Sequence, residues 1–246
     1  MTSTGGLRSR YREQTRAEIK AIALRQLAEG GTGAVALTRI AKELGLSGPA
    51  LYRYFANRDD LLTALIRDAY DDAAAAIAGA GPRAAGEPAR ERLHRLSAAY
   101  RTWAVTHPHR YLLIAGSPQP GYTAPADTVD RARSALGHFL PLFAGAEPVP
   151  AVLPVARRLA AWAEREPAVA EWVAAAVAGT SGEAPPADAG ASSATGISLA
   201  GALMSWTRTH GVISLEVAGH FTGMGHDPAG LLAAEIDILA DAFRLD

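Results

Sequence analysis

The chain has 246 residues, of which 49% are apolar and 20% are charged, enough for one large domain or two small ones with a genuine core. It holds no cysteine, which excludes a disulfide scaffold, thiol catalysis and a thiolate metal site. The formal net charge of −1 gives no indication of a polyanionic partner. We expect neither a secretory leader nor a membrane span, and these observations together favour a soluble cytoplasmic protein.

The charge is divided unevenly along the chain. Residues 1–58 carry ten basic and four acidic residues, a net charge of +6, and the remaining 188 residues carry 14 basic and 21 acidic residues, a net charge of −7. A basic segment joined to an acidic body indicates an end that faces nucleic acid or a membrane, although many basic tails are simply solvated.

Four helices are predicted in the first third of the chain. Residues 1–10 are polar and are expected to be disordered. A capping box at 15–18 opens a helix that two glycines at 30–31 end. A short helix over 37–44, capped by Thr38, stops at Gly45, and a third helix over 47–55 is capped by Ser47. A fourth helix runs from Asn57 to about residue 77.

Further helical patterns fill the rest of the chain. We expect a loop over 79–88, helices over 89–115 with a break at 107–108, and a second loop over 117–125. Helices follow near 127–143 and 150–178, the second broken at Pro167. A mobile connection over 179–196 leads to two final helices, about 197–222 and 228–244. Because no strand pattern is found, the predicted fold is all-α.

The segment 37–55 has the layout of a helix-turn-helix: a helix, a tight glycine turn, and a second helix that begins with small residues. Small residues allow close approach to the major groove, where polar and basic side chains meet bases and phosphates. Together with Asn57-Arg-Asp-Asp-Leu-Leu62, this segment resembles the TetR family of transcriptional regulators. The resemblance implies a three-helix DNA-binding domain with an N-terminal arm (1–58). A fourth helix then links it to a helical regulatory and dimerisation domain (59–246).

The resemblance also implies which side chains contact DNA. Arg39 and Arg53 are candidates for base or phosphate contact, and Arg58 occupies a position that touches the DNA backbone in the family. Alternatively, Arg39 is only a solvated surface charge, and Tyr52 and Tyr54 only pack under the turn. The predicted DNA-binding residues are Thr38, Arg39, Ser47, Gly48, Pro49, Ala50, Tyr52, Arg53, Tyr54 and Arg58.

The C-terminal body offers candidates for a ligand pocket. The residues Trp206-Thr-Arg-Thr-His-Gly211 resemble the Trp-His-Gly motif of one TetR-like C-terminal domain class. Aromatic and imidazole side chains among small apolar residues can line a pocket, although a tryptophan on an apolar helix face is more often part of the core. The candidates are Trp103, His107, Tyr111, Trp162, Trp172, Trp206 and His210.

No catalytic or cofactor motif is found. The histidines at 210, 220 and 226 are spaced too widely for one helix turn, so no metal site is expected. There is neither a serine nucleophile motif nor a phosphate-binding glycine loop, and we expect no cofactor and no enzymatic activity.

The leading hypothesis is therefore a homodimeric repressor that a small molecule releases from a palindromic DNA operator. The resemblance places the dimer interface on the last two helices. The residues that could form its apolar face are Leu199, Leu203, Ile213, Val217, Leu231, Leu232, Ile236 and Leu239. One alternative is a DNA-binding regulator whose body binds a protein or no ligand. A remote alternative is a helical enzyme with an appended DNA-binding module.

Overall fold

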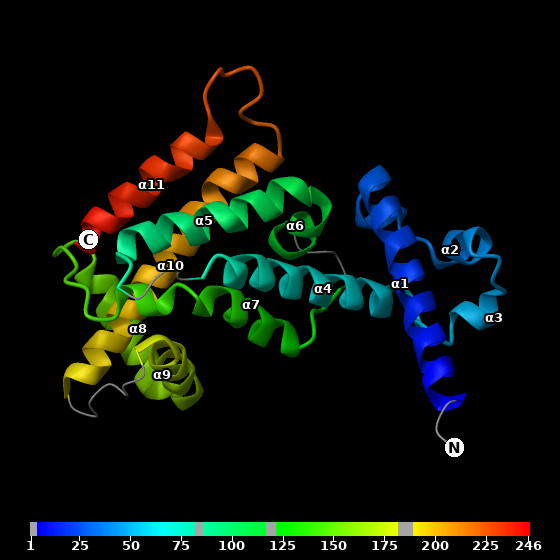
Figure 1. Cartoon of the computed structure of the whole chain (residues 1–246), viewed down its shortest axis with the longest axis horizontal. Coiled ribbons are helices and arrows are strands. Elements are labelled where there is room, and N and C mark those ends of the chain that lie inside the picture. The colour runs from blue at the N-terminus through cyan, green and yellow to red at the C-terminus, as the bar shows by residue number, and fades with distance from the viewer. Residues whose placement is uncertain (1–3, 82–85, 117–121, 182–188) are drawn as a thin grey trace. The chain divides into compact units, whose positions relative to one another are not determined.

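A computed structural model describes residues 4–81, 86–116, 122–181 and 189–246. This part of the chain is dominated by helices and contains no β-strand, which confirms the all-α prediction. The chain packs as two compact units (Figure 1): unit 1 comprises residues 1–69 and 107–128, and unit 2 comprises residues 70–106 and 129–246.

Unit 1 is built on the N-terminal helices. It contains α1 (Thr4–Gly30), η1 (Thr32–Ala34), α2 (Leu37–Glu43), α3 (Gly48–Leu51), α6 (Pro108–Ala115) and the first half of α4 (Arg58–Gly79). α1 packs against η1, α2 and α6, and α2 packs against α3. The helices follow each other closely because Gly31 and Gly45, which lie where α1 and α2 end, have positive φ angles of 67° and 66° that glycine adopts without steric cost.

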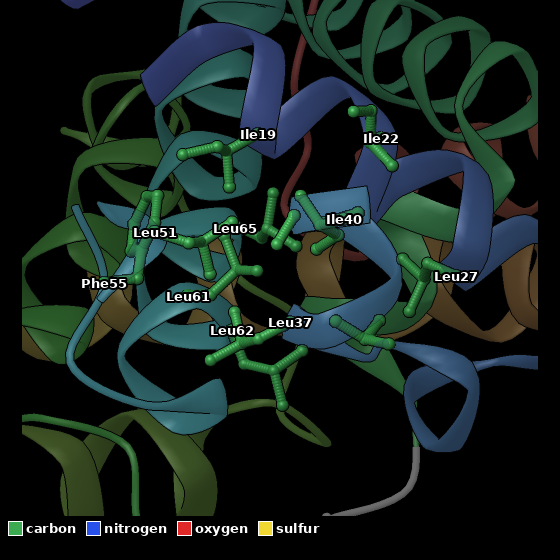
Figure 2. Close-up of a cluster of buried hydrophobic side chains, with 13 residues drawn as sticks. Ile19, Ile22, Leu27, Leu37, Ile40, Leu51, Phe55, Leu61, Leu62 and Leu65 are labelled. Carbon is green, nitrogen blue, oxygen red and sulfur yellow. The ribbon is translucent and has the colours of Figure 1, made fainter. Parts of the chain in front are cut away.

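The core of unit 1 consists of aliphatic side chains and one phenylalanine, Phe55. Figure 2 shows side chains from α1, α2, the α3 segment and α4 converging on one cluster. Ile19, Ile40, Phe55 and Leu61 have no exposed surface. Because the first turns of α4 supply part of this core, the packing unit extends past residue 58. The division of roles between 1–58 and 59–246 stays a prediction.

The N-terminal region differs from the sequence expectation. α1 begins at Thr4, so the residues from 4 onward that were expected to be disordered are helical. The Thr15 hydroxyl donates to the Tyr11 carbonyl at 3.0 Å, a bond from within a helix, so Thr15 is not an N-cap. Thr38 is not the cap of α2 either, because Ala36 holds that position without a side-chain hydrogen bond.

Unit 2 is organised around one long helix. It contains α5 (Ala89–Thr106), most of α7 (Asp127–Gly137), η2 (Leu140–Phe143), α8 (Leu153–Arg165), α9 (Pro167–Ser181), α10 (Ala189–Val217) and α11 (Pro228–Ala242). α10 packs against α5, α8, α9, η2 and α11. The predicted helix breaks near 107–108 and at 167 are confirmed.

The predicted connection over 179–196 is too long at both ends, since α9 continues to Ser181 and α10 begins at Ala189. Residues 182–188, and parts of the predicted loops over 79–88 and 117–125, lie outside the described residues. Among the described helices, none combines the length and apolarity that crossing a membrane requires.

Two glycines let α10 approach its neighbours closely. A Cβ atom added at Gly196 would lie 2.4 Å from the Ala156 carbonyl oxygen on α8, and one added at Gly201 would lie 2.1 Å from Cγ of Phe143. Both distances are far below van der Waals contact. Gly196, which lies in the predicted connection over 179–196, is therefore required by helix packing.

Candidate nucleic-acid interface

The turn between α2 and α3 is fixed by local hydrogen bonds. The Leu46 amide donates to the Ala41 carbonyl across Gly45 at 2.9 Å, and Oγ of Ser47 accepts from the Ala50 amide at 3.3 Å. Pro49 occupies the first turn, where its missing N–H costs no helical bond. The predicted Ser47 cap is confirmed, and the helix itself is shorter than predicted because residues 52–54 form a turn.

Burial on one side of this segment orients the other side outward. Leu51 and Phe55 are buried in the unit 1 core (Figure 2). Tyr52 is 52% exposed, and Arg53 is also exposed. The core contacts thus leave Arg53 on an open surface, which is what reading a DNA groove requires.

The ten predicted DNA-binding residues all lie in unit 1, and none is fully buried. Ala50, Tyr54 and Arg58 are half-buried. The other seven are exposed, namely Thr38, Arg39, Ser47, Gly48, Pro49, Tyr52 and Arg53. The structure therefore leaves this set accessible to a partner, and its role in DNA binding stays a prediction.

The three predicted arginines differ in what they already bind. Arg39 forms an ion pair with Glu29 of α1. Arg58 donates through Nε to the Val35 carbonyl at 3.2 Å and through Nη2 to the Thr32 carbonyl, so it ties α4 to the end of η1. Arg53 makes no ion pair and no side-chain hydrogen bond with any described residue. Its guanidinium is the one of the three that can bind a phosphate or a base without breaking an internal contact.

Two further cations, which the sequence analysis missed, join α1 to the segment after α3 and to α4. Arg16 of α1 donates to the Tyr54 carbonyl at 2.6 Å, and its guanidinium carbon lies 4.3 Å from the centre of the Phe55 ring. Lys20 pairs with Asp68 of α4 at 2.7 Å. Both partners lie more than 35 residues away in sequence, so no local motif marks these contacts.

The seven predicted ligand-binding residues do not form one group. Trp103 and Trp206 stack on Tyr100, with ring centres 5.7 and 4.9 Å away, and Oη of Tyr100 lies 3.1 Å from Nε2 of His210. This aromatic cluster belongs to unit 2, as do the exposed Trp162 and the half-buried Trp172. The remaining two, His107 and Tyr111, belong to unit 1.

Burial shifts the ionisation of two of these groups. Desolvation lowers the pKa of His210 to about 4, so its ring is neutral at pH 7. Desolvation also raises the pKa of Tyr111 to about 12. Both shifts favour the neutral form, which suits apolar surroundings.

Trp172 lines a separate pocket of about 400 Å³ in unit 2. The pocket is formed by the two residues that follow α4 and by α5, α7, η2 and α9, and most of its lining is apolar. Arg92 and Arg133 also line it, and the guanidinium carbon of Arg133 lies 5.9 Å from the centre of the Trp172 ring. His138 contributes an imidazole whose pKa burial lowers. The pocket thus combines an apolar wall with two cations.

Comparisons with known proteins agree with this arrangement. A model of the tetR family of bacterial regulatory proteins matches residues 19–65, and a model described as a tetracyclin repressor-like C-terminal domain matches residues 93–239. The HTH-type transcriptional regulator Rv1816 of Mycobacterium tuberculosis (strain H37Rv) is 41% identical over 122 residues. That match covers 50% of this chain and 52% of the relative, about half of each.

Solved structures resemble the whole fold. The regulatory protein SCO4313 is 39% identical, with a TM-score of 0.73, and the match covers 95% of this chain and 98% of that one. FadR from Bacillus subtilis, solved in complex with stearoyl-CoA, shares the fold at 13% identity, with a TM-score of 0.53 and coverage of 92% and 98%. The chain belongs to the tetR family of bacterial regulatory proteins.

Proposed function

We propose that the chain binds a palindromic DNA operator as a homodimer, and that a small molecule bound in unit 2 releases it. The observation that carries the proposal is Arg53, an exposed guanidinium with no ion pair or side-chain hydrogen bond among the described residues. The burial of Leu51 and Phe55 holds it on residues 47–55, called the recognition segment below. Arginine binds guanine and phosphate through paired donors. The family to which the chain belongs and its relatives named as transcriptional regulators support the same conclusion.

A dimer is needed because one helix-turn-helix contacts too few base pairs to be selective. Of the apolar face predicted from sequence, five residues are buried in the chain's own core, namely Leu199, Ile213, Leu232, Ile236 and Leu239. Their burial leaves a different uncharged surface on the same two helices. α10 exposes Leu203, Thr207, Gly211, Ser214 and Leu215, and α11 exposes Leu231, Ala234 and Ile238. We assign the dimer contact to this surface, called the α10–α11 face below.

The ligand site is assigned to the pocket beside Trp172. Its apolar wall and its two arginines, Arg92 and Arg133, fit an amphiphilic anion, with the acidic group at the cations and the apolar part against the indole. FadR, which shares this fold, was solved with an acyl-CoA, a ligand of that general kind. Such a ligand changes DNA affinity only as far as it binds the DNA-free form more tightly.

The proposal is tested by selecting duplexes from a random DNA pool with the full-length chain. We expect enrichment of a palindrome whose half-sites lie about ten base pairs apart, one helical turn. Failure to enrich any sequence would refute DNA recognition, and enrichment of a single half-site would refute the dimer. A thermal-shift screen with fatty acyl anions, comparing wild type with Trp172→Ala, tests the pocket. Equal shifts in both proteins, or none in wild type, would remove the ligand from this site.

A further inference from the structure

From Gly6 to Gln14, the first turns of α1 contribute no side chain to the buried core of their unit. Every residue from Gly6 to Gln14 is exposed, and burial in α1 begins only at Thr15. The family model that matches the DNA-binding region begins at residue 19, so these turns lie outside it. A solvated helix of this length gains little stability in water. The segment therefore adds a surface to unit 1 without adding to its core.

One side of this segment meets the recognition segment in a groove of about 520 Å³. Leu7, Arg8, Tyr11 and Arg12 line it from α1, and Arg53 and Tyr54 line it from the turn after α3. The four α1 positions are spaced one and four residues apart, which places them on one helix face. Leu7 is 60% exposed and Tyr11 is 68% exposed, so the face is open.

The groove is strongly cationic, and its charge is not neutralised internally. Among the described residues, Arg8, Arg12 and Arg53 have no carboxylate within ion-pair distance, whereas Arg25 pairs with Glu43 and Arg39 with Glu29. Cations in the first turns also oppose the helix dipole, whose N-terminal end is positive. Three unpaired guanidiniums around one open groove are the arrangement expected for a polyanion.

We propose that this groove, called the α1 clamp below, binds the phosphodiester backbone of the operator duplex next to the bases that the recognition segment reads. The inference rests on the proposed function. Arg53 lines the clamp and also sits on the recognition segment, so one DNA strand can pass from the bases beside Arg53 to Arg8 and Arg12. Phosphate contacts fix register and affinity without reading sequence. The clamp thus extends the DNA contact of each subunit beyond the helix-turn-helix.

The test compares Arg12→Ala with Arg10→Ala in the full-length chain. Both arginines are exposed on the same turns of α1, but Arg10 does not line the groove and only donates to the Gly6 carbonyl. Neither has a partner in the core, so both variants should unfold at the wild-type temperature. Affinity for the selected operator is measured by fluorescence anisotropy as a function of salt concentration.

Because a homodimer places two copies of each arginine on the operator, we expect Arg12→Ala to reduce the slope of log K against log salt by about 1.8. The double variant Arg8→Ala/Arg12→Ala should reduce it by about 3.6. Arg10→Ala should keep the wild-type slope, and relative affinities for single-base operator variants should not change. Trimming the duplex to the two half-sites should remove the difference between Arg12→Ala and wild type, because the flanking phosphates are then absent.

Three results would overturn the clamp alone. The first is wild-type affinity and slope in Arg12→Ala on the long duplex. The second is an equal loss in Arg12→Ala and Arg10→Ala, which would show a diffuse charge effect. Altered base preference in Arg12→Ala would also contradict a backbone contact. If wild type binds no duplex at all, the proposed function fails as well, so the two failures are distinguishable.

Discussion

Replacing Gly201 with alanine tests the packing at the centre of unit 2. The added Cβ atom would lie 2.1 Å from Cγ and 2.3 Å from Cδ1 of Phe143, whereas carbon atoms in contact lie about 3.5–4.0 Å apart. Phe143 has no exposed surface, and its ring packs edge-on against Phe243 with centres 4.7 Å apart. The ring therefore has no solvent to move into, and the helix or the ring must shift by more than 1 Å.

The expected magnitude follows from two opposing effects. Alanine stabilises an unstrained helix interior by about 0.5–1 kcal/mol relative to glycine. Overpacking a full core costs about 1–3 kcal/mol and sometimes more. Because the clash is with a fully buried ring, we expect Gly201→Ala to lower the free energy of unfolding by about 2 kcal/mol. For a chain of this size that is a fall in Tm of about 4–8 °C.

Tryptophan fluorescence suits this measurement because all four tryptophans of the chain lie in unit 2. The matched control is Gly79→Ala at the end of α4, where an added Cβ meets nothing within 4 Å, and it should not lower the Tm. Replacing the ring with a smaller side chain, in Phe143→Leu, should reduce the loss of unfolding free energy that Gly201→Ala causes. A Gly201→Ala protein as stable as wild type, or no relief from the smaller residue, would refute the packing argument.

Three other predictions concern different parts of the molecule. Arg58→Ala should lower the stability of unit 1 by about 1 kcal/mol, because the Thr32 and Val35 carbonyls lose a charged donor. Far-ultraviolet circular dichroism should show helix lost at a lower temperature than in wild type, and the unfolding transition seen by tryptophan fluorescence should not change. Because the pKa of His210 is lowered to about 4, the unfolded chain takes up a proton first as pH falls below about 6.5. Stability should then fall by up to about 3 kcal/mol between pH 6.5 and 4, and urea unfolding of His210→Gln should show a weaker pH dependence. Leu215→Glu on the α10–α11 face should shift the chain to monomers in analytical ultracentrifugation, whereas Leu112→Glu, equally exposed on α6, should not; a wild-type mass for Leu215→Glu would place the interface elsewhere.

Local signals in the sequence were sufficient to predict the turn and the recognition segment of the helix-turn-helix. A glycine that must adopt a positive φ, a serine that caps the next helix and apolar residues four apart define the turn before Arg53, and the structure has all of them. These features act within about ten residues of each other. Such short-range features can therefore be predicted from a single sequence.

Contacts between distant residues were not predictable in this way. Nothing near Arg58 indicates that its guanidinium binds carbonyls 23 and 26 residues earlier, and nothing near Arg39 indicates its pairing with Glu29. The start of α1 was missed because Thr15-Arg-Ala-Glu18 has the pattern of a capping box although the helix continues through it. The apolar face assigned to the dimer was mostly core, since helical spacing does not say which partner a face meets.

The central claim is that the chain reads DNA through the segment that carries Arg53. Its most direct test is selection from the same random DNA pool with wild type and with Arg53→Ala in parallel. We expect wild type to enrich a palindrome, and Arg53→Ala to retain binding while losing the base preference at one position in each half-site, a loss of about 1–3 kcal/mol of discrimination. An identical palindrome with identical base preferences from both proteins would contradict the account.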